Sequence, residues 1–495
     1  MKIQQFLQHH GIASNPFADE DAQTDLVFKA TCINNTFHPT WDKIYGDPSE
    51  PATSVVFGEK GSGKTAIRLQ IARHLTDYNA DHPKHQVFVV QYDDFNPFLD
   101  RFRERLSGRR RRRADRTLAQ FRLWDHMDAV LSLAVTQLVD RILGVKQARH
   151  PAARDEALDI SGLDRAQARD ILLLAACYDQ STGDNPEERH HQLCRKLGVS
   201  TWLSKWDLAL GIGVTAVSLL GLVIGWRWAW WIYFLLAILA GWAPRAWRFL
   251  KWYWKAWRIN RSTRVLSHDT NLLRRVLMNF SSSQLVGQPL PAQPRTDDRY
   301  EMLSKLQGVL RSLHFEGILV LVDRIDEPYL INGSADLMKA LLWPMLDNKF
   351  LKHPGVGVKL LLPAEVERMV DREDRDFHQR ARLDKQNLIR SLAWTGQSLY
   401  DLAGARVAAC ALEGSSPTLA DLFEPAIDTS RLMQAFATLR VPRHLFKFLY
   451  RVFTTHCNAY SDEKPVWKIS VGTFESVLAL YQRDQDAFDR GVGAV

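Results

Sequence analysis

Residues 58–66 have the types and spacing of a loop that binds nucleotide phosphates. Its glycines let backbone N–H groups close around phosphate, its lysine reaches the β- and γ-phosphates, and its threonine ligates Mg²⁺. The apolar run at 54–57 reads as a buried strand, and an amphipathic helix follows the loop. This complete Walker A motif predicts ATP and Mg²⁺ as ligands of Gly58, Glu59, Lys60, Gly61, Ser62, Gly63, Lys64, Thr65 and Ala66.

A second group of acidic residues follows an apolar stretch later in the chain. Five consecutive apolar residues after Gly317 predict a strand buried on both faces, as in a parallel sheet. Asp323 comes at the carboxyl end of this strand, where parallel sheets bind ligands, so we assign it to Mg²⁺ together with Thr65. Glu327, or alternatively Asp326, is expected to polarise the attacking water, and a loop or helix-capping role is the alternative for both.

Two long apolar runs lie between these motifs. Residues 208–226 carry no ionisable side chain over 19 positions, which is about 28 Å of helix and close to the thickness of a bilayer core. Residues 228–243 form a second run that reaches spanning length at about residue 247, with interfacial aromatic residues. Basic residues flank both runs on their outer sides. We predict a two-helix transmembrane hairpin that contacts the lipid bilayer through 208–247; a hairpin buried in a water-soluble core is the alternative.

The composition limits the class of protein. With 495 residues, 46% of them hydrophobic and 24% charged, the chain exceeds one ordinary domain and is neither disordered nor fibrous. The mean hydropathy of −0.23 excludes a chain built mostly of membrane helices. Five cysteines without a CxxC pattern argue against a disulfide framework and a structural zinc site. We expect His190, His191 and Cys194 on a surface helix rather than around a metal.

Basic residues concentrate in two segments, which together exceed the net charge of +8. Residues 101–116 contain nine Arg, including the run 109–113, and residues 245–264 contain seven Lys or Arg with no acidic residue. We expect these segments in solvated loops or against anionic lipid headgroups, where each basic residue gains about 1 kcal/mol. Nucleic acid is the alternative partner of the arginine run.

The residues around Asp323 resemble a motif of known ATPases. The run 320–327, apolar residues followed by Asp-Arg-Ile-Asp-Glu, resembles the Walker B motif of the STAND/NACHT and Orc-like branches of AAA-type P-loop ATPases. Lys64 and Asp323 are 259 residues apart, and membrane helices inserted between the two motifs resemble the layout of KAP NTPases. The resemblance covers roughly residues 15–95 and 299–450.

The resemblance implies further nucleotide contacts. Arg382, or Arg380, would act as an arginine finger, and Arg443 would be the sensor-2 arginine that touches the γ-phosphate. Asn15-Pro16-Phe17 resembles the short segment that packs near adenine in such ATPases. The alternatives are surface arginines for Arg380 and Arg382, and an ordinary helix start for Pro442-Arg443.

The segment after Asp323 predicts one more strand and one more helix. Residues 357–363 read as the next parallel strand, which lacks the Ser, Thr or Asn sensor of such ATPases; Glu365 is the nearest polar group. Residues 387–394 read as a helix.

These signals predict an α/β fold: a parallel-sheet P-loop NTPase core with a helical insertion that carries the transmembrane hairpin, and a C-terminal helical lid. The expected segments are the N-terminal part of the core with Walker A (1–106), the helical insertion (107–204), the transmembrane hairpin (205–250), a basic juxtamembrane segment and linker (251–298), the C-terminal part of the core with Walker B (299–400) and the helical lid (401–495).

We therefore expect a membrane-anchored, Mg²⁺-dependent ATPase that uses nucleotide state to switch conformation or assembly. The resemblance implies a homo-oligomer, an unidentified effector protein and a role in bacterial phage exclusion or defence. The resemblance implies the bacterial inner membrane, and the positive-inside rule predicts that both termini and the ATPase domain lie in the cytoplasm. The alternatives are a nonhydrolysing nucleotide-gated membrane scaffold and a membrane-associated ATPase that handles DNA.

Overall fold

The computed structural model describes the chain as two compact units. Unit 1 contains Met1–Asp81, Leu321–Asp326 and Asp347–Val495, and unit 2 contains His82–Val320 and Glu327–Leu346. Most of the arginine run at 109–113 and residues 225–230, where the two apolar runs meet, lie outside the described residues. The described residues are 1–108, 111, 113–145, 158–181, 185–199, 206–224, 231–280 and 287–489.

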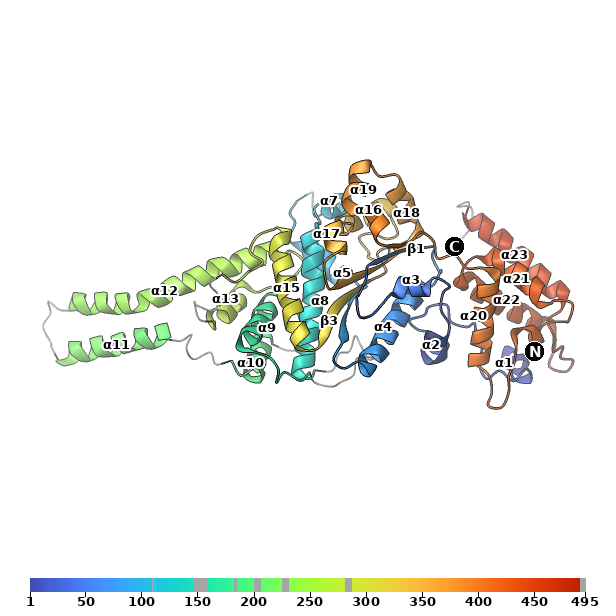
Figure 1. Cartoon of the computed structure of the whole chain (residues 1–495), viewed down its shortest axis with the longest axis horizontal. Helices are drawn as coiled ribbons and strands as arrows, with labels where there is room; N and C mark the ends of the chain where they lie inside the picture. The colour runs from blue at the N-terminus through green and yellow to red at the C-terminus, as the bar shows by residue number, and fades with distance from the viewer. Residues whose placement is uncertain are drawn as a thin grey trace. The chain divides into compact units, whose positions relative to one another are not determined.

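Five parallel strands form a sheet in the order β2-β3-β4-β1-β5 (Figure 1). Strand β1 pairs with β4 and β5, and places Val55 opposite Leu360 and Leu388. Every residue of β1 and β4 is buried, as expected for strands of a parallel sheet covered on both faces. The α/β class and the parallel sheet are therefore as the sequence predicts. The strands are β1 (Ser54–Gly58), β2 (Gln86–Tyr92), β3 (Phe315–Val322), β4 (Val356–Pro363) and β5 (Asn387–Ile389).

Unit 1 places one long helix directly after β1 and a group of helices at its C-terminal end. The long helix is α4 (Lys64–Asp81). The shorter helices of unit 1 are α1 (Ile3–His9), η1 (Phe28–Cys32), α2 (Ile33–Asn35) and α3 (Trp41–Tyr45) before α4, α17 (Asn348–Leu351) before β4, and α18 (Ala364–Asp371), α19 (Arg375–Ala381), η5 (Leu383–Lys385) and η6 (Leu419–Leu422) after β4.

The C-terminal helices of unit 1 share a hydrophobic core with α1. These helices are α20 (Gly396–Ala409), α21 (Thr429–Leu439), α22 (Pro442–Ala459) and α23 (Val471–Asp489). In α22 the buried residues recur every three or four positions, at Leu445, Phe448, Leu449 and Val452, which is the pattern of a helix with one face in a core. We call α20 to α23 the C-terminal helical cluster.

Unit 2 is built around helices that a buried ion pair holds together. Arg299 of α15 contacts Asp128 of α8 at 2.9 Å with both side chains fully buried, and the Tyr178 hydroxyl of α9 donates to Asp128 at 3.1 Å. The helices are α5 (Asn96–Glu104), α7 (Ala114–Leu118), α8 (Leu123–Leu143), α9 (Arg165–Tyr178), α10 (Pro186–Lys196), α11 (Trp206–Ile224), α12 (Trp231–Ser262), α13 (Thr270–Met278), α15 (Thr296–Ser312), α16 (Ala335–Leu342) and η4 (Trp343–Met345).

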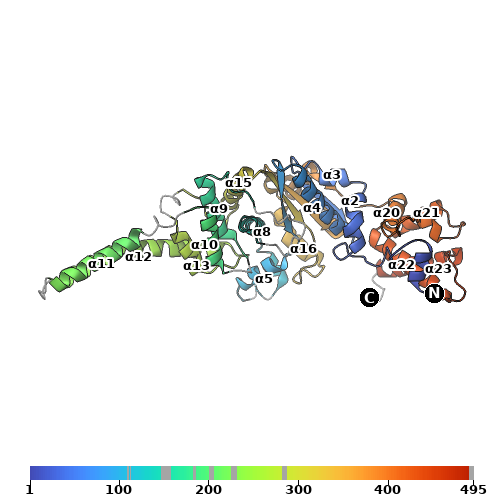
Figure 2. The ribbon, with the colours of Figure 1, turned by 90° about the horizontal axis from the view of Figure 1, so that it is seen from below.

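Helices α11 and α12 occupy the region predicted to span a membrane and lie side by side (Figures 1 and 2). Among the described residues, no helix combines the length and the apolar character needed to cross a bilayer. Helix α12 does not end with its apolar run; it continues through Pro244 into a half rich in basic and aromatic residues that ends at Ser262. The predictions of a transmembrane hairpin and of an integral inner-membrane protein are therefore wrong.

Candidate phosphate-binding site

The loop between β1 and α4 has a backbone that requires glycine. Gly61 and Gly63 have φ angles of 88° and 96°, in the left-handed region that side chains avoid. A Cβ on Gly58 would lie 2.4 Å from Ser62 Oγ, and a Cβ on Gly61 would lie 2.6 Å from the Cβ of Arg443. The loop is therefore compact, and α4 begins directly after it, at Lys64.

Lys64 is folded back onto the loop that precedes it. Its ammonium donates to the carbonyl oxygens of Gly58 at 2.8 Å and Glu59 at 2.9 Å. Burial lowers the pKa of Lys64, whereas the charges of Asp323, Asp326 and Glu365 raise it and that of Arg443 lowers it further. Three acidic groups and one further cation thus act on the predicted phosphate-binding lysine.

Thr65 and Asp323 connect the two predicted motifs. The Thr65 hydroxyl donates to Asp323 Oδ2 at 2.9 Å, although 258 positions separate the two residues. Asp323 follows the last residue of β3, and Thr65 lies in the first turn of α4 after β1. Both residues belong to unit 1, and the parallel sheet places the ends of their strands at the same edge.

Arg68 makes a second contact with the same carboxylate. Its Nε lies 3.2 Å from Asp323 Oδ2, and each of the two side chains is only 2% exposed. Arg68 lies one helical turn after Lys64, on the buried face of α4 with Ile67 and Ile71. The guanidinium neutralises a buried carboxylate that would otherwise be costly to desolvate.

The oxygen atoms brought together here fit Mg²⁺. A hydroxyl and a carboxylate are ligands that this ion prefers, usually completed by water and phosphate oxygens. In the loop itself, Ser62 Oγ is buried without a hydrogen-bond partner, which leaves a polar atom for an incoming group. Across the described part of the chain, no group of three or more His, Cys, Asp and Glu side chains is arranged to hold a metal ion.

The two acidic residues predicted to activate water are placed differently. Asp326 belongs to unit 1, is half-buried and acts through its charge on Lys64. Glu327 is exposed and is the first residue of the segment Glu327–Leu346 of unit 2. The structure therefore associates Asp326 with the loop more directly than it does Glu327.

Arg443 lies against the loop, at the start of α22. Its backbone N–H donates to the Gly61 carbonyl at 3.3 Å, and its side-chain carbons surround the place where a Gly61 Cβ would be. Pro442 occupies the first turn of α22, which fixes where the helix begins. The residue predicted as sensor-2 arginine thus lies against the loop predicted to bind phosphate.

Arg380 and Arg382 lie at the end of α19. Arg382 has a φ of 45° and closes the helix, since its N–H donates to His378 O at 2.9 Å. Its guanidinium pairs with Asp384 at 3.4 Å and is 40% exposed. Arg380 is exposed and donates to the Asp376 carbonyl at 3.4 Å. Both arginines contact residues close to them in the sequence, as the alternative interpretation of surface arginines predicts.

Trp394 also contacts the loop, and sequence reasoning gave it no role. Its Nε1 donates to the Ser62 carbonyl at 2.9 Å, and His38 packs against it edge to face at 4.8 Å. The helix predicted at 387–394 is wrong, because Asn387–Ile389 form β5 and pair with β1. A strand of three residues is too short to show the two-residue alternation that distinguishes strands from helices.

The Asn15-Pro16-Phe17 segment packs into the C-terminal helical cluster. Phe17 is buried, with Phe446 and Phe453 at ring distances of 5.9 and 5.8 Å. The Pro16 carbonyl accepts a hydrogen bond from Arg406 Nε at 2.6 Å. The contacts of this segment are thus those of a core element of unit 1.

Arg68 is the other residue at the site that sequence reasoning missed. The available signal was an arginine on the apolar face of the helix that follows the loop, one turn after Lys64. Its partner comes from a strand 255 positions later, so local spacing does not identify it.

Comparisons of the chain with protein-family models, with curated proteins and with solved structures each find no match.

Proposed function

We propose that this protein is a Mg²⁺-dependent ATP hydrolase whose nucleotide state switches its conformation. The observation that supports this most directly is the 2.9 Å contact of Thr65 with Asp323, which joins a complete phosphate-binding loop to an acidic residue at the end of β3. A hydroxyl and a carboxylate at that place are a ligand pair for the Mg²⁺ of a nucleotide.

The loop residues bind and orient the phosphates. Backbone N–H groups at the N-terminus of α4 point to the anion, and the ammonium of Lys64 exchanges its two carbonyl partners for phosphate oxygens. Mg²⁺, held by Thr65 and Asp323, supplies positive charge that offsets the charge of the phosphates. Asp326 or Glu327 orients the attacking water by accepting its proton.

Two contacts of the loop support a conformational switch. Arg443, at the start of α22, donates to the Gly61 carbonyl, and Trp394, just before α20, donates to the Ser62 carbonyl. A bound γ-phosphate attracts the guanidinium of Arg443, and because the backbone N–H of Arg443 is bonded to Gly61, this attraction acts on the start of α22. Both contacts lie at or just before the first residues of helices in the C-terminal helical cluster.

The test is turnover of ATP by the purified full chain. Lys64→Ala and Asp323→Ala are expected to abolish phosphate release, because the first removes the loop cation and the second removes a Mg²⁺ ligand. Arg73→Ala, on the exposed side of the same α4, is the matched control and should retain activity. ATP binding without turnover in the wild type would support a nonhydrolysing nucleotide-gated scaffold instead.

We also propose a homo-oligomer, in which the partly exposed guanidinium of Arg382 leaves Asp384 for the nucleotide site of a neighbouring copy of the chain. An arginine supplied in trans stabilises the charge that develops on the transferred phosphoryl group. Light scattering in the presence of ATP tests this: a monomer at all concentrations contradicts it.

A further inference from the structure

The second half of α12 has one packed face and one exposed face. Arg248 anchors the packed face, because its guanidinium donates to the carbonyl oxygens of Met278 and Phe280, both at 2.7 Å. Asp207 of α11 contacts the same guanidinium at 3.4 Å. Trp252, Ala256 and Ile259 continue this buried face at helical spacing. The orientation of α12 about its axis is therefore fixed.

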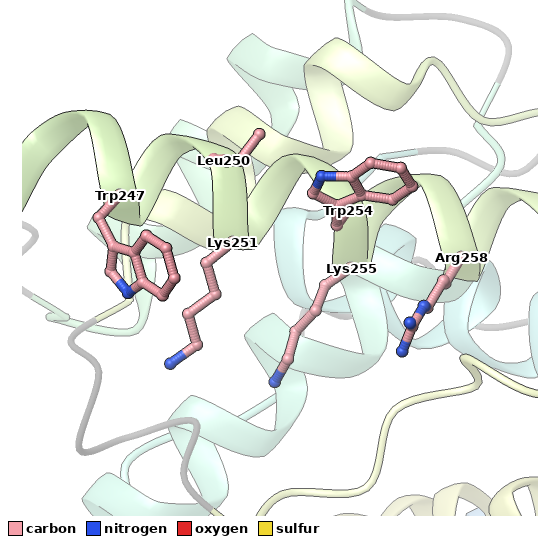
Figure 3. A pocket seen from close by; sticks show the side chains of 6 residues that line it. All are labelled: Trp247, Leu250, Lys251, Trp254, Lys255 and Arg258. Carbon is pink, nitrogen blue, oxygen red and sulfur yellow. The ribbon is translucent and has the colours of Figure 1, made fainter.

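The exposed face combines aromatic and basic side chains around a hollow of about 380 Å³ (Figure 3). Figure 3 shows Lys251, Lys255 and Arg258 projecting to the same side of α12 as Trp247. Trp247 is 72% exposed and Trp254 is 52% exposed, which is unusual for the largest apolar side chain. The residues that line the hollow are Trp247, Leu250, Lys251, Trp254, Lys255 and Arg258.

The charge of α12 has one sign only. Between Trp231 and Ser262 the helix carries six Lys or Arg and no Asp or Glu. Asp207, the acidic residue of α11, is buried and paired with Arg248. A partner that covers this face must therefore be anionic. In a two-fold interface between two copies of the chain, the basic residues of one copy would face the same basic residues of the other, and their repulsion is unfavourable.

The surface next to the basic face is aliphatic. Helices α11 and α12 pack through small residues, with Gly211 against Trp242 and Gly241 against Val214, and turn other side chains outward. The exposed apolar side chains extend over two helices, and this apolar patch is larger than those usually found on the surface of a monomeric soluble protein. A nucleic acid has no apolar layer to receive aliphatic side chains, whereas a lipid surface has acyl chains below its phosphates. The outward aliphatic residues include Ile212, Val217, Leu219, Leu220, Val223, Leu235, Leu236 and Leu239.

We propose that the α11–α12 hairpin binds the surface of an anionic lipid bilayer without crossing it. Lys251, Lys255 and Arg258 contact headgroup phosphates, and Trp247 and Trp254 lie at the level where headgroups meet acyl chains. The aliphatic side chains of the hairpin lie among the outer parts of the acyl chains. This binding is independent of the nucleotide site, which lies in unit 1, whereas the hairpin belongs to unit 2.

The experiment is vesicle flotation of the full chain. We expect binding to vesicles of phosphatidylcholine mixed with phosphatidylglycerol, weaker binding at high salt, and little binding to phosphatidylcholine alone. The triple variant Lys251→Gln, Lys255→Gln, Arg258→Gln should lose about 100-fold in partition constant, because each basic residue near an anionic surface contributes about fivefold. Trp247→Ser with Trp254→Ser should weaken binding even at low salt.

The matched control replaces three exposed arginines of unit 1, Arg368, Arg372 and Arg375, by Gln and changes the net charge equally. It should bind the mixed vesicles as the wild type does. Equal binding by the control and the α12 triple variant, or equal binding of the wild type to both vesicle types, overturns the proposal. The proposal is also overturned if the wild type and the control bind a DNA oligonucleotide at the same salt concentration and only the α12 triple variant does not. Lys64→Ala should bind vesicles normally, which separates this result from that of the ATPase proposal.

Discussion

Removing the guanidinium of Arg68 should destabilise the protein strongly in the absence of Mg²⁺. Arg68 and Asp323 are each 2% exposed and contact at 3.2 Å. Arg68→Met keeps much of the side-chain volume but leaves a buried carboxylate whose remaining described partner is the Thr65 hydroxyl. Breaking one side of a buried ion pair costs about 3–5 kcal/mol of unfolding free energy. Asp323→Asn in the same chain removes the charge and should recover most of this loss.

The assay is urea unfolding followed by circular dichroism in buffer with a chelator. The control is Arg73→Met on the same helix, because its partner Asp77 lies at 3.2 Å and both side chains are about half exposed. An exposed pair of this kind contributes about 0–1 kcal/mol. Mg²⁺ with ATP at about 100 times the dissociation constant should restore about 2.7 kcal/mol to Arg68→Met. The reasoning is refuted if Arg68→Met and Arg73→Met unfold at the same urea concentration.

Three further predictions concern single residues of the sheet and the site. Burial lowers the pKa of Lys359 from 10.5 to about 7, so between these pH values the unfolded chain binds more protons than the folded chain and stability rises with pH. The unfolding free energy of the wild type should therefore rise by about 1.4 kcal/mol per pH unit relative to that of Lys359→Met. A difference between the two proteins that does not change with pH contradicts this prediction. Arg382→Ala should lower kcat far more than ATP affinity, and mixing it with Lys64→Ala should restore part of the turnover if the arginine acts in trans; absence of restoration excludes a shared site. Asp326→Asn should abolish turnover and leave ATP binding intact, because Asp326 is the acidic residue whose charge acts on Lys64; full activity would move the role of base to Glu327.

The glycine-rich loop after β1 and its contact with Asp323 were predictable because each motif lies at the end of a buried apolar strand. A parallel sheet brings such ends to one edge, so the pairing of Thr65 with Asp323 follows from two local patterns and one rule of topology. Arg68 and Trp394 were not predictable in this way. Their partners come from distant parts of the chain, and the packing that joins them is a property of the folded unit.

The hairpin shows where apolar length alone misleads. Residues 231–243 of the second apolar run form the first part of α12, and the same helix continues into a basic and aromatic half. Hydropathy measures the uncharged stretch and does not report where the helix ends or which face packs. Arg248 sets that face through its contacts with Met278, Phe280 and Asp207, all of which lie outside the window that a hydropathy plot averages.

The central claim is that the loop at 58–65 and Asp323 together hold Mg²⁺ and ATP. Calorimetric titration of ATP into the full chain, with and without Mg²⁺, tests this most directly. We expect Mg²⁺ to raise the affinity of the wild type for ATP by about tenfold or more, and Asp323→Asn to bind ATP equally well with and without Mg²⁺. A wild type that does not bind ATP, or an Asp323→Asn variant with the same dependence on Mg²⁺, would contradict the account.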